Sequence, residues 1–164
     1  MSAIIVMGPS GCGKSTLGKV LAADLGWVFV EGDDLHPQAN IHKMSAGIPL
    51  TDDDRQPFLH NVGRAIAEFQ DSGVVAACSS LKKTYRDLLR TYAPDVLFVL
   101  PPSDRDTLLA NMAVRGDHFM PTSLVDSQLE TLEIPGGEEH CLLLTSEVTA
   151  QAVVAEVKAF LDLA

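Results

Sequence analysis

The stretch Ala3-Ile-Ile-Val-Met-Gly-Pro-Ser-Gly-Cys-Gly-Lys-Ser-Thr16 decides the fold of this 164-residue chain. Residues 3–7 form a short apolar run, which is typical of a fully buried strand. Residues 8–15 fit the pattern Gly-x-x-x-x-Gly-Lys-Ser, whose glycines let backbone N–H groups curl around a phosphate. Apolar residues then recur with helical spacing up to Gly26. The stretch therefore predicts a strand, a phosphate-binding loop and a helix in succession.

Several residues of this loop have a predicted role toward a nucleoside triphosphate. Lys14 can reach the outer phosphates, and the hydroxyl of Ser15 can ligate Mg²⁺. The N-terminus of the following helix adds a partial positive charge beneath the phosphates. A chance glycine-rich turn is the alternative, but the strand before the loop and the helix after it argue against chance. The predicted nucleotide-binding residues are Gly8, Ser10, Gly11, Cys12, Gly13, Lys14, Ser15 and Thr16.

The composition predicts one globular domain over residues 1–164 with an excess of acidic side chains. The 22 Asp and Glu residues outnumber the 12 Lys and Arg residues, so the chain should repel nucleic acid and acidic membranes. An anionic substrate must then be held by local cations. The three cysteines are scattered without metal-ligand spacing, which argues against a disulfide framework. Since we find neither a leader nor an apolar stretch of about 20 residues, we expect a cytoplasmic protein.

Four more apolar runs predict strands, at residues 27–31, 74–78, 95–100 and 141–145. Segments with helical spacing lie between them, and Ser103 with Asp106 resembles a capping box at the start of one helix. Five strands that alternate with helices imply a parallel sheet between two helical layers. The regular pattern fails over about residues 112–122, where we expect a mobile lid. The predicted fold class is α/β, a three-layer P-loop domain with a five-stranded parallel sheet.

Charged residues follow the second and third predicted strands, at the edge of the sheet where ligands bind in such folds. Asp33 comes two residues after the second strand. Lys82 and Arg86 follow the third strand and lie four residues apart at the start of a helix. We expect these two cations to lie at the same edge of the sheet as Asp33, although either could instead belong to a solvated helical face.

A second group of polar residues lies between the second strand and the next long helix. His36, Asn40 and Lys43 have spacings that put all three on one helical face. That face is either solvated or binds a ligand, and spacing alone favours the solvated face. Arg55 has two interpretations: it is an ion-pair partner for Asp52, or its guanidinium is a fork for a carboxylate or phosphate.

The remaining motifs favour a small-molecule kinase over other phosphate-loop proteins. The chain lacks the Asp-x-x-Gly switch and the Asn-Lys-x-Asp base-reading motif of GTPases. It also lacks the arginine-rich or repeated surface of a nucleic-acid machine. Phosphoryl transfer requires positioning, charge neutralisation and shielding from water. The lysine of the loop, an acid near the metal and a closing lid would meet these requirements.

Several stretches beyond the phosphate loop have a specific order and spacing. They are Glu31-Gly-Asp-Asp-Leu-His-Pro37, Asn40-Ile-His-Lys-Met44, Gly47-Ile-Pro-Leu-Thr-Asp-Asp-Asp-Arg55, Cys78-Ser-Ser-Leu-Lys-Lys-Thr-Tyr-Arg-Asp87, His118-Phe119, Ser127-Gln128 and Leu132-Glu133. Together with the loop they resemble the gluconokinase family, whose members are small P-loop kinases related to shikimate and nucleoside-monophosphate kinases. The resemblance covers nearly the whole chain, and the block from 31 to 55 is its most specific part.

The resemblance implies ATP-dependent phosphorylation of D-gluconate to 6-phospho-D-gluconate by a homodimer that uses Mg²⁺. It implies that Asp33 contacts the acceptor hydroxyl and that Glu31 helps Ser15 to hold Mg²⁺. Arg115 and His118 would belong to the lid. The implied catalytic residues are Lys14, Asp33 and Arg115. The implied substrate-binding residues are Asp33, His36, Asn40, Lys43, Arg55, Lys82, Arg86 and His118.

The chain departs from the family pattern at Asn111, where the resemblance leads us to expect an arginine. The lid then carries one cation fewer than the family pattern implies. Two alternative functions stay open. A kinase of another small sugar acid or of a shikimate-like acceptor would use the same fold. A nucleotide-binding sensor would have lost catalysis, but intact Lys14, Ser15 and Asp33 argue against it.

Overall fold

The five predicted strands form one parallel sheet in the computed structural model, which describes residues 2–115, 122–144 and 149–161. The strand order across the sheet is β2-β3-β1-β4-β5. The strands are β1 (Ala3–Val6), β2 (Val28–Glu31), β3 (Val74–Ala77), β4 (Leu97–Leu100) and β5 (Cys141–Leu143). The predicted strands and their parallel arrangement are therefore confirmed, with slightly shorter bounds.

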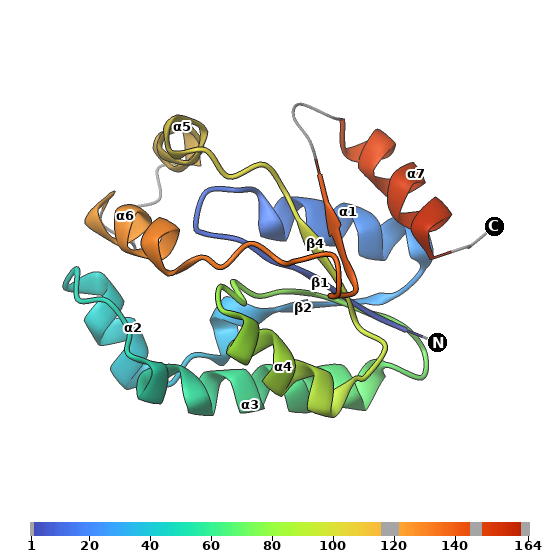
Figure 1. Ribbon diagram of the computed structural model, residues 1–164, viewed down its shortest axis with the longest axis horizontal. Helices are drawn as coiled ribbons and strands as arrows, with labels where there is room; N and C mark the ends of the chain where they lie inside the picture. The colour runs from blue at the N-terminus through green and yellow to red at the C-terminus, as the bar shows by residue number, and fades with distance from the viewer. Residues whose placement is uncertain (1, 116–121, 145–148, 162–164) are drawn as a thin grey trace.

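Helices cover both faces of the sheet, so the predicted three-layer architecture is confirmed (Figure 1). One face carries α1 (Lys14–Leu25) and α7 (Ala150–Phe160), and the opposite face carries α3 (Asp52–Phe69) and α4 (Lys83–Tyr92). Successive side chains of β1 point to opposite faces of the sheet, as in any strand, so alternate residues pack into the two cores. Ile4 packs in the core under α1 and α7, whereas Ile5 packs in the core under α3 and α4.

The remaining helices gather beyond the carboxyl ends of the strands (Figure 1). They are the 3₁₀ helix η1 (Gly32–Leu35), α2 (Gln38–Ser45), α5 (Arg105–Arg115) and α6 (Thr122–Thr131). A third apolar cluster, formed by Met44, Leu108, Met112, Leu124 and Val125, joins α2, α5 and α6. The prediction that the regular pattern fails from about residue 112 is wrong at its start, because residues 112–115 are the end of α5. Residues 116–121 of the predicted lid lie outside the described part of the chain, so closure of the lid stays a prediction. No helix in the described ranges is both long and apolar enough to span a membrane.

The predicted end of α1 agrees with the structure, but the predicted start of α5 does not. The N–H of Gly26, which has a left-handed φ of 70°, caps the end of α1 as predicted. The predicted capping box of Ser103 and Asp106 is wrong. Asp104 caps α5 instead, since its Oδ2 accepts the backbone N–H of Thr107 at 3.1 Å. The sequence offers several capping residues in succession here, and a shift of one residue is within the usual uncertainty of a helix end.

Gly32 brings the chain after β2 into close contact with β3. A Cβ added at Gly32 would lie 2.2 Å from the carbonyl oxygen of Ala77, which is too close for any other residue. Since that oxygen belongs to the backbone of the central sheet, it cannot move aside. Gly32 therefore fixes where η1 begins, and with it the position of Asp33.

We predict that Gly32→Ala lowers the free energy of unfolding by about 2 kcal/mol, the usual scale for forcing extra volume into a packed site. Gly137→Ala is the matched control, because nothing lies within 4 Å of a Cβ built there. The control should change the stability by less than about 0.5 kcal/mol. Urea unfolding of both variants measures the difference, and equal stabilities would contradict the close approach.

Candidate active site

The phosphate-binding loop has the backbone that its motif predicts. Gly8, Gly11 and Gly13 have φ values of 127°, 88° and 87°, a region that side chains with a Cβ rarely adopt. Gly11 also lies against α5, where an added Cβ would stand 2.5 Å from the carbonyl oxygen of Leu108. The glycines therefore allow both the curl of the loop and its contact with α5.

Three elements from distant parts of the chain hold this loop in place. The N–H of Gly8 donates to the carbonyl of Ser79 after β3 at 3.0 Å. The N–H of Ser10 donates to Oε1 of Gln128 on α6 at 2.7 Å. Nδ2 of Asn111 on α5 donates to the carbonyl of Gly11 at 2.7 Å. The residue that departs from the family pattern therefore ties α5 to the loop through a neutral hydrogen bond.

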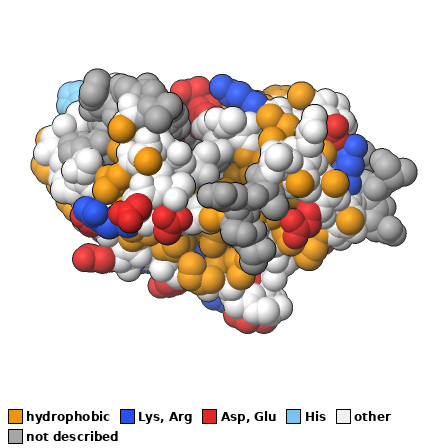
Figure 2. All heavy atoms as spheres, turned by 90° about the horizontal axis from the view of Figure 1, so that it is seen from above, with side chains coloured by type: hydrophobic (Ala, Val, Ile, Leu, Met, Phe, Trp, Pro, Cys, Tyr) orange, Lys and Arg blue, Asp and Glu red, His pale blue; other side chains and the backbone are white. Residues whose placement is uncertain are grey.

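A cavity of about 700 Å³ lies beside the loop, between α1, α5 and α7. Cys12, Gly13 and Thr16 form its floor, and residues near the start of α5 and on α7 form its walls. The walls include Pro101, Pro102, Asn111, Leu144 and Val153. Seen from the side of α5 and α7, hydrophobic side chains occupy much of the middle of the molecule (Figure 2). A large cavity with apolar walls next to a phosphate-binding loop suits a nucleotide.

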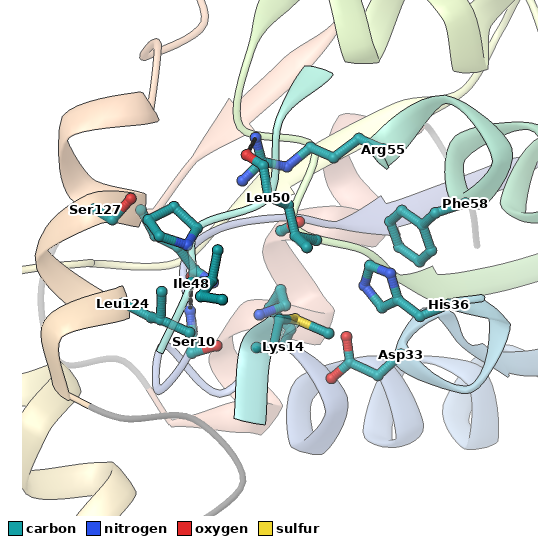
Figure 3. Close-up of a pocket in the computed structure, with 14 residues that line it drawn as sticks. Ser10, Lys14, Asp33, His36, Ile48, Leu50, Arg55, Phe58, Leu124 and Ser127 are labelled. Atoms are coloured by element: carbon teal, nitrogen blue, oxygen red, sulfur yellow. Dashed lines mark hydrogen bonds between the residues drawn. The ribbon is translucent and has the colours of Figure 1, made fainter. Parts of the chain in front are cut away.

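A second, smaller cavity of about 40 Å³ brings together several of the predicted site residues (Figure 3). Lys14 and Asp33 lie on one side of it, and Arg55 lies across the cavity from them (Figure 3). His36 lies between Asp33 and Phe58. The remaining lining residues are Ser10, Met44, Ile48, Pro49, Leu50, Phe58, Ser79, Leu124, Ser127 and Gln128. The cavity therefore combines two cations, a carboxylate and an imidazole within walls that carry both apolar and neutral polar side chains.

Lys14 and Asp33 follow β1 and β2 and border the same small cavity at the carboxyl edge of the sheet. Lys14 is the first residue of α1, and its Nζ donates to the carbonyl of Pro9 at 3.3 Å. Asp33 lies in η1, directly after Gly32, and is exposed to solvent. An ammonium and a carboxylate that border the same cavity can act on a phosphate and on a hydroxyl group, respectively.

His36 is a neutral imidazole stacked on an aromatic ring. Its ring lies parallel to that of Phe58, with ring centroids 3.7 Å apart and an angle of 7° between the planes. Burial lowers the pKa of His36 to about 4, although the nearby Asp33 carboxylate acts in the opposite direction. The side chain is therefore uncharged at neutral pH.

Arg55 faces the cavity and is not the partner of Asp52. Its Nη1 donates to the carbonyl of Leu50 at 3.0 Å and to the hydroxyl of Tyr85 at 2.9 Å. Asp52 instead accepts a short hydrogen bond from Tyr85 and pairs with Lys82 at 3.0 Å. Nε and Nη2 of Arg55 have no hydrogen-bond partner among the described residues, so the guanidinium keeps donors for a ligand.

Three predicted substrate residues, Asn40, Lys43 and Lys82, are not among the described residues that line the small cavity. Nζ of Lys43 contacts Oδ2 of Asp54 at 2.7 Å, and Nδ2 of Asn40 donates to the backbone carbonyl of Asp54 at 2.8 Å. Lys82 pairs with Asp52, at the start of α3. Hydrogen bonding from Lys43 lowers the pKa of Asp54 to about 2. These residues hold α2 and α4 against α3.

The prediction that Arg86 binds substrate is wrong, because Arg86 is fully buried away from both cavities. Its Nε and Nη2 donate to Glu139 at 2.8 and 3.0 Å. Its Nη1 donates to the carbonyls of Ser80 and Leu81 at 2.9 and 3.1 Å. The spacing of four residues from Lys82 was misleading, since Lys82 is the N-cap of α4 and has an extended backbone. The two side chains therefore do not share a helical face.

The two predicted residues of the lid are described only in part or not at all. Arg115 is the last residue of α5, but its side chain falls outside the described part, as does the whole of His118.

Ser15 lies in the first turn of α1 and is half-buried. Glu31 ends β2, and the strand register aligns it with Ala77 and Val6. It therefore stands two strand spacings from β1, which is about 10 Å.

Ser15 and Glu31 form an incomplete site for Mg²⁺ by themselves. The described residues include no group of three or more His, Cys, Asp or Glu side chains that could hold a metal ion. Mg²⁺ usually takes only one or two protein ligands and completes its shell with waters and substrate phosphates. The donor types present therefore fit Mg²⁺ held together with a nucleotide.

The structure adds three polar residues that the site prediction missed, Ser79, Ser127 and Gln128. Ser127 and Gln128 lie on α6, and Gln128 contacts the phosphate loop. Their stretch is among those that carry the family resemblance, so that resemblance was the available signal. No charge or spacing pattern marks them.

Comparisons with known proteins agree with these observations. The family model for shikimate kinase matches residues 10–121. The thermosensitive gluconokinase of Escherichia coli K12 is 44% identical, over 92% of this chain and 87% of that protein. The gluconokinase of Gluconobacter oxydans 621H is 43% identical, over 94% of this chain and 88% of that protein.

Solved structures give the same result. The crystal structure of a gluconokinase from Sinorhizobium meliloti 1021 has a TM-score of 0.87 and 46% identity, covering 98% of this chain and 91% of that chain. A shikimate kinase from Acinetobacter baumannii in complex with shikimate has a TM-score of 0.59 at 16% identity, over 99% and 94% of the two chains. This second likeness is one of fold alone.

We predict that Glu139→Gln lowers the free energy of unfolding at neutral pH by roughly 3 kcal/mol, because it leaves the buried guanidinium of Arg86 without its counter-charge. Hydrogen bonds from Arg86 lower the pKa of Glu139 from 4.5 to about 2. The stabilisation is therefore fully present above about pH 4.5 and is lost as the pH falls toward about 2.

Urea unfolding of the wild type and the variant between neutral and acid pH measures this difference. The gap in stability should narrow as the pH falls below about 4.5, following the carboxylate's titration. Glu138→Gln is the matched control, because Glu138 is the exposed neighbour. A gap that does not depend on pH would contradict the ion pair.

Proposed function

The chain belongs to the gluconokinase family, and we propose that it transfers the γ-phosphoryl group of ATP to D-gluconate. The products are ADP and 6-phospho-D-gluconate. The observation that carries the proposal is the small cavity itself, in which Lys14 and Asp33 face Arg55 beside the phosphate loop. An acceptor with a carboxylate at one end and a primary hydroxyl at the other matches that arrangement of charges.

The larger cavity is the proposed site of the nucleotide. Its apolar walls suit an adenine ring, and the loop at its floor offers N–H groups to the phosphates. Lys14 would then approach the transferred phosphoryl group, where its charge counts most in the transition state. Ser15 and Glu31 would hold Mg²⁺, which neutralises charge on the phosphates when bound. Residues of the lid, including Arg115 and His118, would exclude water.

The small cavity is the proposed site of gluconate. The guanidinium of Arg55 can bind the carboxylate as a fork, and Asp33 on the opposite side can accept the proton of the reacting hydroxyl. A volume of about 40 Å³ holds only a few water molecules, so gluconate requires the walls to separate. These walls are residues 48–50 and the part of α6 around Leu124 and Ser127.

We also propose that the enzyme acts in the cytoplasm, where ATP is available, and that it is a homodimer. The support for the dimer is the resemblance to the family. Light scattering of the purified protein at several concentrations tests it, and a mass of one chain throughout would contradict it.

We predict that gluconate is a much better acceptor than glucose, which has no carboxylate for Arg55. The loss should be about 1.5–3 kcal/mol in transition-state stabilisation, the scale of a charge-assisted hydrogen bond. A coupled assay of ADP release gives kcat/KM for both sugars and for a panel of other sugar acids. Equal values for gluconate and glucose would contradict the proposed function.

The Arg55→Gln variant links this preference to one side chain. It should raise KM for gluconate and reduce the preference over glucose by about tenfold or more, while KM for ATP stays near the wild-type value. Arg64→Gln is the matched control, because Arg64 lies on the exposed face of the same helix. An unchanged preference in Arg55→Gln would assign the carboxylate to another group.

We predict that Asp33→Asn lowers kcat by about 10²–10⁴, the usual contribution of a positioned general base. The amide keeps the shape of the side chain but cannot accept the proton of the acceptor hydroxyl. Asp34→Asn is the matched control, since Asp34 is the exposed neighbour in η1 and is not among the described residues of the cavity. Turnover near the wild-type value in Asp33→Asn would end the catalytic assignment.

A further inference from the structure

The side chain of Asn40 has an orientation that one contact fixes. Asn40 is buried, at 3% exposure, and its Nδ2 donates to the backbone carbonyl of Asp54 at 2.8 Å. A carbonyl oxygen only accepts hydrogen bonds, so the NH₂ end of the amide must face it. The nitrogen of Asn40 cannot be exchanged with its oxygen without placing two acceptors against each other.

The second hydrogen of the same nitrogen is directed at His36. Nδ2 of Asn40 lies 3.2 Å from Nδ1 of His36. Since Asn40 is the donor, Nδ1 of His36 must be the acceptor and carries no proton. A neutral imidazole with a bare Nδ1 carries its hydrogen on Nε2. The carbonyl of Asp54 therefore determines the tautomer of His36 through Asn40.

The surroundings of His36 favour the neutral ring. Phe58 covers one face of the imidazole at a centroid distance of 3.7 Å. The charged groups that act on the ring are Asp33, which favours the protonated form, and Arg55, which disfavours it. The carboxylate of Asp54 is engaged by Lys43 and by the N–H of Thr51. Burial outweighs Asp33, so the pKa of His36 falls to about 4.

Nε2 of His36 is the remaining polar atom of this ring. It has no hydrogen-bond partner within the part of the chain that the structure describes, and the ring borders the small cavity between Phe58 and Asp33 (Figure 3). The cavity therefore offers a neutral N–H donor beside the carboxylate acceptor of Asp33. A sugar hydroxyl, which both donates and accepts, complements such a pair.

We propose that Asn40 holds His36 as the neutral Nε2–H tautomer, so that His36 donates a hydrogen bond to a hydroxyl oxygen of the acceptor sugar acid. His36 then contacts the substrate, and Asn40 is a positioning residue that acts through it. The proposal rests on the proposed function only for the identity of the acceptor. The tautomer itself is a property of the free protein.

Nitrogen NMR of the free protein tests the tautomer without any substrate. Histidine labelled with ¹⁵N gives separate signals for protonated and unprotonated ring nitrogens, and His36→Gln identifies the His36 signals by their loss. At neutral pH we expect a protonated Nε2 and an unprotonated Nδ1. A protonated Nδ1, with or without a protonated Nε2, would overturn the proposal.

Two substitutions of His36 test the use of the donor. The amide nitrogen of Gln is four bonds from Cα, like Nε2 of His36, whereas that of Asn is three bonds away, like Nδ1. His36→Gln should therefore retain a kcat/KM for gluconate at least about tenfold higher than that of His36→Asn. Both should leave KM for ATP unchanged. Equal losses in the two variants, or no loss in either, would overturn the role of Nε2.

Asn40→Asp should change the pH dependence of kcat/KM, which would not be expected if Asn40 had only a structural role. Its carboxylate would accept a proton from Nδ1 and raise the pKa of His36, so the Nε2–H donor would persist only in the protonated ring. Relative to the wild type, kcat/KM for gluconate should then rise by about tenfold as the pH falls from about 9 to about 6. A pH profile parallel to the wild type would overturn the role of Asn40.

The matched control is Asn61→Asp, because Nδ2 of Asn61 donates to the carbonyl of Leu35 at 3.0 Å, next to His36 in the chain. It makes the same chemical change at a side chain of α3 that contacts Leu35 and not the imidazole, so its pH profile should match the wild type. If Asn40→Asp does not fold, the NMR signals and the two His36 variants still decide the proposal.

Failure of the proposed function can be told apart from failure of this inference. If the wild type does not phosphorylate gluconate, the proposed function is wrong. The NMR result then still decides the tautomer, and the two His36 variants are compared with the best acceptor of the sugar-acid panel.

Discussion

The structure depends on holding the curled backbone of the phosphate-binding loop in place at the carboxyl edge of a parallel sheet. A loop of this kind has no regular hydrogen-bond partners of its own, so other elements must hold it. Gly8 is held by Ser79 after β3, Gly11 by Asn111 on α5, and Ser10 by Gln128 on α6. Both cavities border the loop. Their shapes therefore depend on the same contacts that hold the loop in place.

Because acidic residues are in excess, several cations near the site are engaged in ion pairs and are not available to anionic ligands. Ion pairs engage Lys43 with Asp54, Lys82 with Asp52, and Arg86 with Glu139. These residues also position the segments around the cavity. Arg86 donates hydrogen bonds to the carbonyls that follow β3, and the backbone carbonyl of Asp54 fixes the amide that orients His36. Among the described residues, Lys14 and Arg55 are the cations that line the small cavity, on opposite sides. A negatively charged chain can thereby hold two anionic groups at a defined separation.

The cavity also combines charged and neutral donors, which act differently. A charged donor such as Arg55 attracts an anion strongly but selects little by shape, whereas a neutral N–H in an apolar setting requires an acceptor in one position. His36 is neutral because Phe58 and the surrounding walls remove it from water. The apolar residues of the cavity therefore contribute to recognition by keeping this imidazole uncharged. Neutrality and orientation come from different neighbours, Phe58 and Asn40.

The fold was predictable because local patterns indicate it: the strand and loop around Gly8, the apolar runs of the other strands, and the glycine that ends α1. The loop motif predicted a phosphate role for Lys14, and the position after the second strand marked Asp33 as a candidate, whereas Arg55 and His36 were predicted to bind substrate only through the family resemblance. Which polar residues reach the cavity depends on packing between distant segments and was not predictable from local patterns. Lys82 and Arg86 have the same spacing as a helical pair, yet Lys82 precedes the first turn of α4 and pairs with Asp52, while Arg86 is buried against Glu139. The tautomer of His36 likewise depends on a carbonyl 18 residues away, at Asp54. Sequence patterns report local spacing, whereas burial and hydrogen-bond partners are set by packing between distant segments.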